Sequence, residues 1–168
     1  MTFGQAISTC FRKFVTFRGR APRSEYWYFL LFGVLLSIPA SIIDLALSNQ
    51  SGGTPGARPL TGLLSLVLFL PRLSVSVRRL HDVNYSGWFL GGFFIYLVAA
   101  VGIIIAYAAN VGSNKPDFAS PIGIFAIVAA LGMFAWIIWL FVLTVLKGTS
   151  GPNKYGDDPL GANADVFN

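Results

Sequence analysis

Hydrophobic residues fall into four long runs that are separated by short polar segments. The runs cover residues 26–47, 60–79, 88–109 and 121–146. About 20 apolar residues in a helix, rising 1.5 Å per residue, cross the hydrocarbon core of a bilayer. The pattern therefore predicts an all-α membrane protein with four transmembrane helices, organised as a single membrane domain over residues 1–168.

The first two runs carry polar or small residues on one helical face. On the first run these residues recur at steps of three and four: Gly33, Ser37, Ser41 and Asp44. The second run has a polar stripe: Thr61, Ser65, Arg72, Ser76 and Arg79. Small residues allow helices to approach closely in lipid, so we expect these two faces to meet. Arg72 can reach the nearer interface with its long side chain.

Residues 2–18 show a different pattern, with Phe3, Phe11 and Phe14 at helical spacing and basic residues between them. This pattern predicts an amphipathic helix. The helix could lie in the headgroup plane of the membrane or pack against the end of the protein's own helices. At the other end of the chain, residues 148–168 are rich in Gly, Pro, Asn and Asp, which predicts a polar tail.

Composition supports lipid as the solvent for most of the chain. The sequence is 55% hydrophobic and 11% charged, whereas soluble domains are about 25% charged. The single cysteine, Cys10, excludes an intrachain disulfide and a cysteine-based zinc site. No metal site and no cofactor is predicted.

The basic residues are distributed unevenly between the polar segments. If the N-terminus is cytoplasmic, ten of the twelve Lys and Arg residues lie on the cytoplasmic side, and the outer loops hold only Arg58 and Lys115. The positive-inside rule then predicts that both termini are cytoplasmic. Because the cations flank apolar runs, the net charge of +5 favours acidic lipid headgroups over nucleic acid as a partner.

Three polar motifs stand between or after the apolar runs. They are Gly-Arg-Ala-Pro-Arg-Ser-Glu-Tyr-Trp at residues 19–27, Arg-Arg-Leu-His-Asp with Ser-Gly-Trp at residues 78–88, and Gly-Pro-Asn-Lys-Tyr-Gly-Asp-Asp-Pro at residues 151–159. In this order the chain resembles the bacterial inner-membrane family called domain of unknown function 805, the YhaH/YhaI-like proteins. The resemblance covers about residues 5–160 and implies a small multi-pass protein of the bacterial cytoplasmic membrane. It implies no activity. Val83-Asn84-Tyr85 replaces the shorter or more glycine-bearing turn expected after the second motif.

In the four-helix interpretation the three motifs gather at the cytoplasmic interface. The candidate residues there, together with the membrane arginine, are Arg20, Arg23, Glu25, Arg72, Arg78, Arg79, His81 and Asp82. They could form a structural ion-pair network, with Glu25 on Arg78 or Arg79 and Asp82 on Arg20 or Arg23. They could instead bind a phosphate or another anion, because the guanidinium fork matches that geometry. At the outer side, Asp44 is expected to pair with Arg58.

Little in the sequence favours catalysis. His81 and Asp82 could act as a general acid–base pair, but no nucleophile elbow, zinc-protease motif or phosphate-binding loop is present. The sequence therefore predicts a non-enzymatic scaffold or interaction protein. Its predicted partners are membrane lipids, with a homo-oligomer or a membrane protein as further partners. The alternative is a small transporter or pore-forming subunit, for which the Arg72 stripe is the main argument.

Overall fold

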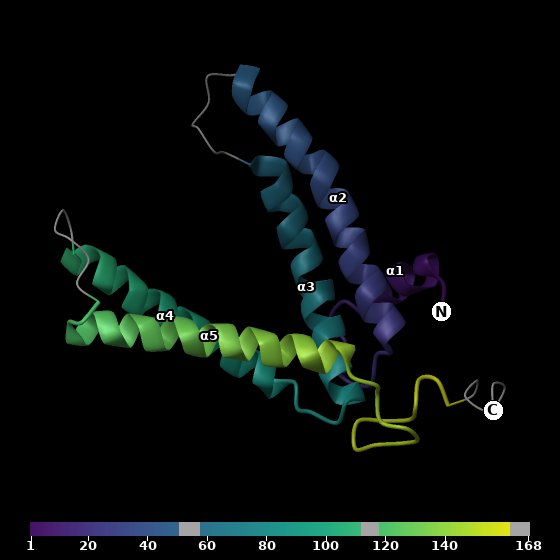
Figure 1. The fold of residues 1–168 in the computed structure, drawn as a ribbon. Coiled ribbons are helices and arrows are strands. Elements are labelled where there is room, and N and C mark those ends of the chain that lie inside the picture. The colour runs from purple at the N-terminus through teal and green to yellow at the C-terminus, as the bar shows by residue number, and fades with distance from the viewer. Residues whose placement is uncertain (51–57, 112–117, 162–168) are drawn as a thin grey trace. The chain divides into compact units, whose positions relative to one another are not determined.

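The computed structural model describes residues 1–50, 58–111 and 118–161. These residues form helices, turns and one isolated β-bridge, and no strand. The helices are α1 (Phe3–Arg12), α2 (Arg23–Gln50), α3 (Pro59–Asp82), α4 (Trp88–Val111) and α5 (Pro121–Val145) (Figure 1). The last four are long and apolar enough to cross a membrane. The predicted class, an all-α protein with four candidate spans and a short N-terminal helix, is confirmed.

The chain divides into two compact units. One contains residues 1–85 and 147–168, and the other contains residues 86–146. The first unit includes α1, α2, α3 and the C-terminal tail, and the second is the α4–α5 pair. That the two form a single membrane domain stays a prediction.

The N-terminal helix packs on its own unit rather than standing apart from it. Its buried residues, Ala6 and Cys10, face α2 and α3, and the Phe11 ring makes an edge contact with Phe29 at 5.7 Å. Thr2 and Gln5 form a capping box that starts α1. This arrangement supports the second of the two interpretations of the amphipathic segment.

Helix α1 ends at Arg12, earlier than the predicted boundary at residue 18. The Ser74 hydroxyl on α3 lies 2.7 Å from the carbonyl oxygens of both Lys13 and Thr16 and shares its proton between them. The Thr16 N–H also donates to the Lys13 carbonyl, at 2.9 Å. A turn that contacts α3 therefore takes the place of a continuing helix. Gly19 then adopts a positive φ of 85°, which only glycine reaches without strain.

Helices α2 and α3 run antiparallel, because Glu25 at the start of α2 meets Arg78 near the end of α3 while Asp44 meets Thr61 at the opposite end. Their two polar faces touch as expected. Gly33 leaves room for the guanidinium of Arg72, which a Cβ atom at this position would strike.

Asp44 caps helix α3 from the neighbouring helix. Its carboxylate accepts hydrogen bonds from the backbone N–H groups of Leu60 at 3.0 Å and Thr61 at 2.9 Å, and from the Thr61 hydroxyl at 2.7 Å. The N-cap residue itself, Arg58, makes no side-chain cap bond. Asp44 was expected to form an ion pair with Arg58. Its oxygens instead satisfy the open N–H groups at the start of a helix, where a negative charge is also favoured.

Helices α4 and α5 also pair in antiparallel fashion. The Tyr96 hydroxyl donates to the carbonyl of Ala129 at 2.9 Å, and Phe89 contacts Trp139 at 5.1 Å between ring centroids. Ser120 caps α5, and Pro121 takes the first turn, where its missing N–H is not needed. Most large apolar side chains of this pair point outward, as lipid-facing residues do.

The turn after α3 contains a residue with positive φ that is not glycine. Asn84 has a φ of 64°, and the N–H groups of Asn84 and Tyr85 donate to the carbonyls of His81 and Leu80. This is a Schellman ending, in which asparagine is the usual substitute for glycine. Asn84 therefore supplies the positive φ that a glycine provides in such a turn.

Replacing Asp44 tests the cap on α3. Asp44→Ala leaves two backbone N–H groups and a hydroxyl without an acceptor where water is scarce, so we expect the melting temperature in detergent to fall by several degrees. Asp44→Asn retains one acceptor oxygen and should fall between the wild type and Asp44→Ala. Equal melting temperatures for all three proteins would show that the cap contributes nothing.

Candidate functional site

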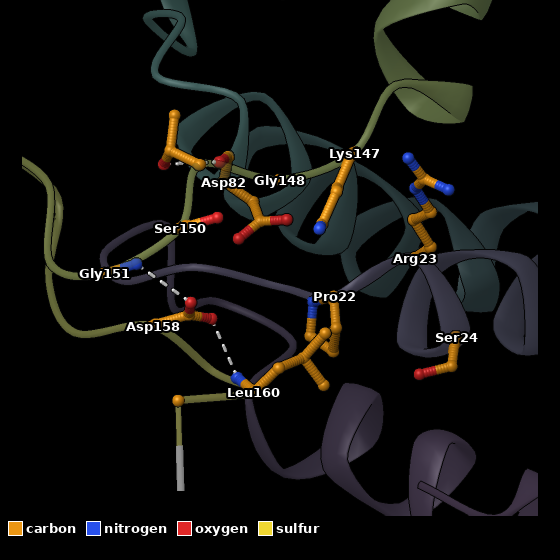
Figure 2. Close-up of a pocket in the computed structure, with 12 residues that line it drawn as sticks. Pro22, Arg23, Ser24, Asp82, Lys147, Gly148, Ser150, Gly151, Asp158 and Leu160 are labelled. Carbon is orange, nitrogen blue, oxygen red and sulfur yellow. Dashed lines mark hydrogen bonds between the residues drawn. The ribbon is translucent and has the colours of Figure 1, made fainter. Parts of the chain in front are cut away.

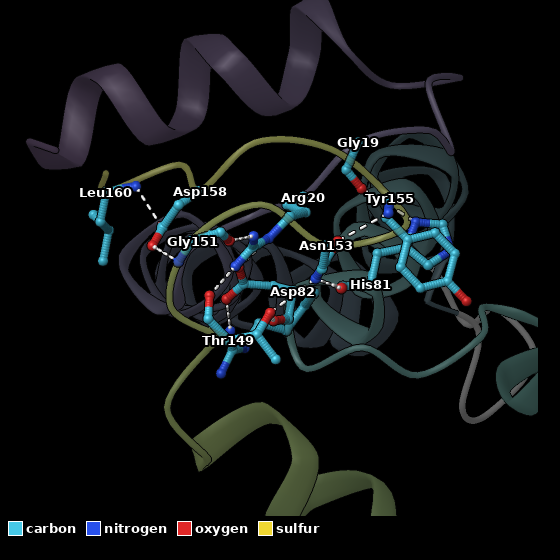
Figure 3. Close-up of polar contacts among 11 residues, drawn as sticks. Gly19, Arg20, His81, Asp82, Thr149, Gly151, Asn153, Tyr155, Asp158 and Leu160 are labelled. Carbon is cyan, nitrogen blue, oxygen red and sulfur yellow. Dashed lines mark hydrogen bonds and ion pairs between the residues drawn. The ribbon is translucent and has the colours of Figure 1, made fainter. Parts of the chain in front are cut away.

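The polar end of the first unit is built around the Asp82 carboxylate. Its Oδ1 accepts from Arg20 Nε at 3.0 Å (Figure 3). Its Oδ2 is paired with Arg79, one helical turn earlier. All three residues are buried: Arg20 is 8% exposed, Arg79 0% and Asp82 4%. Buried charges are tolerated only when they are paired, so these contacts depend on one another. We call this region, formed by residues 19–25, 78–82 and 147–158, the headpiece.

A second buried pair lies beside the first. Arg78 Nη1 is 2.6 Å from Glu25 Oε1, and the Cys10 thiol points at the same oxygen from 3.7 Å. Burial, and then the neighbouring charge of Glu25, raise the pKa of Cys10 to about 12. For each carboxylate the sequence left two arginines as possible partners, and one of the two is present: Arg78 for Glu25 and Arg20 for Asp82.

The C-terminal tail is part of the headpiece, and Arg20 joins the two. Arg20 donates to the carbonyl oxygens of Thr149 and Gly151 as well as to Asp82. The Thr149 N–H and hydroxyl both donate to the backbone carbonyl of Asp82, at 2.9 and 3.0 Å. Asn153 donates to the carbonyl of His81 at 3.0 Å. All three sequence motifs thus meet at one place, as predicted.

His81 contacts both the segment before α2 and the C-terminal tail. Its Nδ1 lies 3.1 Å from the carbonyl oxygen of Gly19, so Nδ1 carries the proton and donates. Its ring stacks on Tyr155 with 3.9 Å between centroids and 6° between planes. The Asp82 carboxylate is engaged by two arginines. Each residue of the proposed acid–base pair is therefore occupied with other partners.

A cavity of about 690 Å³ opens beside the Asp82 network. Its walls come from the start of α2, the end of α3 and the tail: Pro22, Arg23, Ser24, Asp82, Lys147, Gly148, Thr149, Ser150, Gly151, Asp158, Leu160 and Gly161. Figure 2 shows Arg23 and Lys147 together on one side and Asp158 on the other. Arg23 and Lys147 are exposed, so their charges are accessible to a ligand. We call this cavity the headpiece pocket.

Positive charge is in excess around the headpiece pocket. The pocket lining holds two cations, Arg23 and Lys147, and two carboxylates, Asp82 and Asp158. Two further cations outside the lining, Arg20 and Arg79, are paired with Asp82. Asp158 accepts from the N–H groups of Leu160 and Gly151. These bonds, with the nearby charges of Arg20 and Lys147, hold the pKa of Asp158 below its usual range. Both carboxylates are already engaged, which leaves net positive charge for an anion.

The remaining predicted site residues lie elsewhere. Arg72 is inside the α2–α3 pair at Gly33, and Asp44 and Arg58 are at the opposite end of these helices. No group of three or more His, Cys, Asp and Glu residues that could hold a metal is found in the part of the chain that the structure describes.

Four tail residues that complete the site were not singled out as site residues from the sequence: Lys147, Thr149, Asn153 and Tyr155. The available signal was the third motif, because its turn-forming residues indicate a defined loop rather than an unstructured tail.

Gly148 tests whether the headpiece is held by Asp82. A Cβ atom at Gly148 would collide with the Asp82 carboxylate, which two arginines hold in place. Gly148→Ala should therefore lower the free energy of unfolding by about 2 to 4 kcal/mol, the scale of a disrupted buried ion pair. Gly4→Ala is the control because a Cβ there meets nothing within 4 Å. Equal thermal stability of the two variants would contradict this account.

Cys10 tests the burial of the second pair. With its pKa near 12, the thiol has about a thousandfold less thiolate than an ordinary cysteine at the same pH. We expect no maleimide labelling of the folded protein at pH 8 and full labelling after denaturation. Rapid labelling of the folded protein would show that the contact of α1 with Glu25 opens readily.

Comparison with known proteins agrees with this architecture. Residues 14–157 match the family described as "Protein of unknown function (DUF805)". The chain is 33% identical to "Inner membrane protein YhaH" of Escherichia coli K12 over 62% of this chain and 83% of that protein. It is 30% identical to "Inner membrane protein YhaI" of the same strain over 88% of this chain and 89% of that protein. No solved structure matches the chain. The chain therefore belongs to the DUF805 family of membrane proteins.

Proposed function

We propose that the protein is a non-enzymatic interaction protein of the bacterial inner membrane whose headpiece pocket binds the headgroup of an acidic phospholipid. The observation that carries this proposal is the excess of cations around a cavity whose carboxylates are already engaged. Arg23 supplies a planar fork of donors and Lys147 a mobile point charge, and both groups suit a phosphate.

The position of the headpiece supports a lipid as the ligand. Arg23 is the first residue of α2, and Lys147 follows α5 by two residues. Both therefore stand where apolar helices end, at the level of lipid headgroups. Anionic headgroups attract basic residues there with about 1 kcal/mol for each Lys or Arg. The relatives are named inner membrane proteins. The concentration of Lys and Arg in the segments at this end supports an orientation with both termini in the cytoplasm.

The contacts of the polar stripes favour an interaction protein over a transporter. The hydroxyls of Ser37, Ser41 and Ser65 donate to carbonyls of their own helices, and Asp44 is engaged as a cap. These four groups are satisfied locally and line neither the headpiece pocket nor the small cavity between α2 and α3, whose lining takes only Arg72 and Ser76 from the stripes. The contacts of His81 and Asp82 likewise support a structural role over acid–base catalysis.

Lipid binding by two charge variants tests the proposal. Delipidated protein in neutral detergent is titrated with phosphatidylglycerol or phosphatidylcholine, and binding is followed by native mass spectrometry. We expect Arg23→Gln/Lys147→Gln to weaken phosphatidylglycerol binding about ten- to thirtyfold, since two phosphate-facing cations are removed. The charge-matched control is Arg12→Gln/Arg18→Gln, whose exposed cations lie outside the pocket. Equal binding by both double variants, or no preference for phosphatidylglycerol in the wild type, would refute the proposal.

A further inference from the structure

Arg72 is a charged residue within a membrane-spanning helix. It lies ten residues before Asp82, the last residue of α3, which corresponds to about 15 Å of helix. Ionisable groups at such depth are costly unless they meet a partner, and they often mark a binding site. Within residues 1–50, 58–111 and 118–161, no carboxylate lies within ion-pair distance of the Arg72 guanidinium.

The neighbouring helix makes room for this guanidinium. Gly33 stands opposite it on α2, and any larger side chain there would collide with Arg72 Nη2. Arg72 Nε is buried and has no hydrogen-bond partner among the atoms that the structure describes. The guanidinium therefore occupies the space above Gly33 while part of its donor capacity is unused, which is costly where water is scarce.

The guanidinium lines a small cavity between α2 and α3. The cavity has a volume of about 160 Å³ and is lined by Tyr26, Phe29, Leu30, Arg72, Val75 and Ser76. The Ser76 hydroxyl is already engaged, because it donates to the carbonyl of Arg72 at 2.7 Å. Among the lining residues, Arg72 supplies the charge, and Phe29, Leu30 and Val75 supply apolar surface. No lining residue is shared with the headpiece pocket.

The cavity lies close to the ends of the two helices. Tyr26 is three residues from the start of α2, and Ser76 is six residues from the end of α3. These separations correspond to about 5 and 9 Å. A phosphate at the lipid headgroup level can reach this depth, especially because arginine extends its side chain toward the interface.

We infer that the Arg72 cavity is a second anion site, which binds the phosphate of a phospholipid whose acyl chains lie along α2 and α3. The guanidinium would donate to the phosphate oxygens, and the apolar walls would contact the glycerol and the upper acyl chain. The source of the phosphate is a lipid rather than a free ion because the walls offer apolar surface beyond the single charge. This inference does not depend on lipid binding at the headpiece pocket.

Native mass spectrometry in the Arg23→Gln/Lys147→Gln background isolates this site. Phosphatidylglycerol is the probe, and excess inorganic phosphate is the competitor. We expect Arg72→Gln to reduce retained phosphatidylglycerol about tenfold and Arg72→Lys to reduce it less. Inorganic phosphate should not displace the lipid. Displacement by inorganic phosphate would overturn the assignment to a lipid.

A glycine variant separates binding from folding. Gly33→Ala displaces the end of the flexible Arg72 side chain and leaves the charge in the protein. It should weaken phosphatidylglycerol binding about as much as Arg72→Gln. Gly62→Ala is the matched control, because it adds a methyl group in a helix where nothing lies within 4 Å. If Gly33→Ala binds as tightly as Gly62→Ala, the inference is wrong, whether or not Arg72→Gln folds.

Discussion

One buried guanidinium connects the three segments on which the first unit depends. Arg20 comes from the linker between α1 and α2, and it contacts the Asp82 carboxylate of α3 and two carbonyl oxygens of the tail. These segments are far apart in sequence, and each contributes one of the three motifs. A buried guanidinium has five donors and a charge to satisfy, so its partners are held as a set. The constraint at Arg20 is therefore electrostatic, and hydrophobic packing stabilises the helices around it.

This constraint explains why the short C-terminal tail packs against the polar end of the unit. The tail has little helix-forming content, yet it is anchored by Arg20, by the Asp82 carbonyl and by the stacking of Tyr155 on His81. The anchored tail in turn forms one wall of the headpiece pocket. Under the proposed function, structure and binding are linked: the engaged carboxylates hold the fold, and the exposed cations Arg23 and Lys147 bind an acidic headgroup.

The sequence was sufficient to predict the four apolar helices, because hydrophobic run length is a local signal. It narrowed each of the two long-range ion pairs to two alternatives, because the expected spans bring the polar motifs to one end of the helices. It was insufficient for Asp44, whose partner is a helix start and not the nearest cation. Backbone N–H groups are not taken into account when partners are predicted from the charges of side chains. The end of α1 was missed for a related reason, because a hydroxyl from α3 contacts the carbonyls of the turn that follows the helix. The contribution of Gly33 and Gly148 is visible only in the folded protein, because each leaves space for a side chain distant in sequence, Arg72 and Asp82 respectively.

The central claim is that Arg20 holds the tail on the helix ends. Hydrogen exchange of the tail amides in lipid nanodiscs, comparing the wild type with Arg20→Gln, tests it most directly. The account predicts that the amides of Thr149, Gly151 and Asn153, which donate hydrogen bonds in the native fold, are protected in the wild type. In Arg20→Gln they should exchange at rates close to those of a free peptide, while α3 stays protected. Unchanged protection of the tail in Arg20→Gln would contradict the claim.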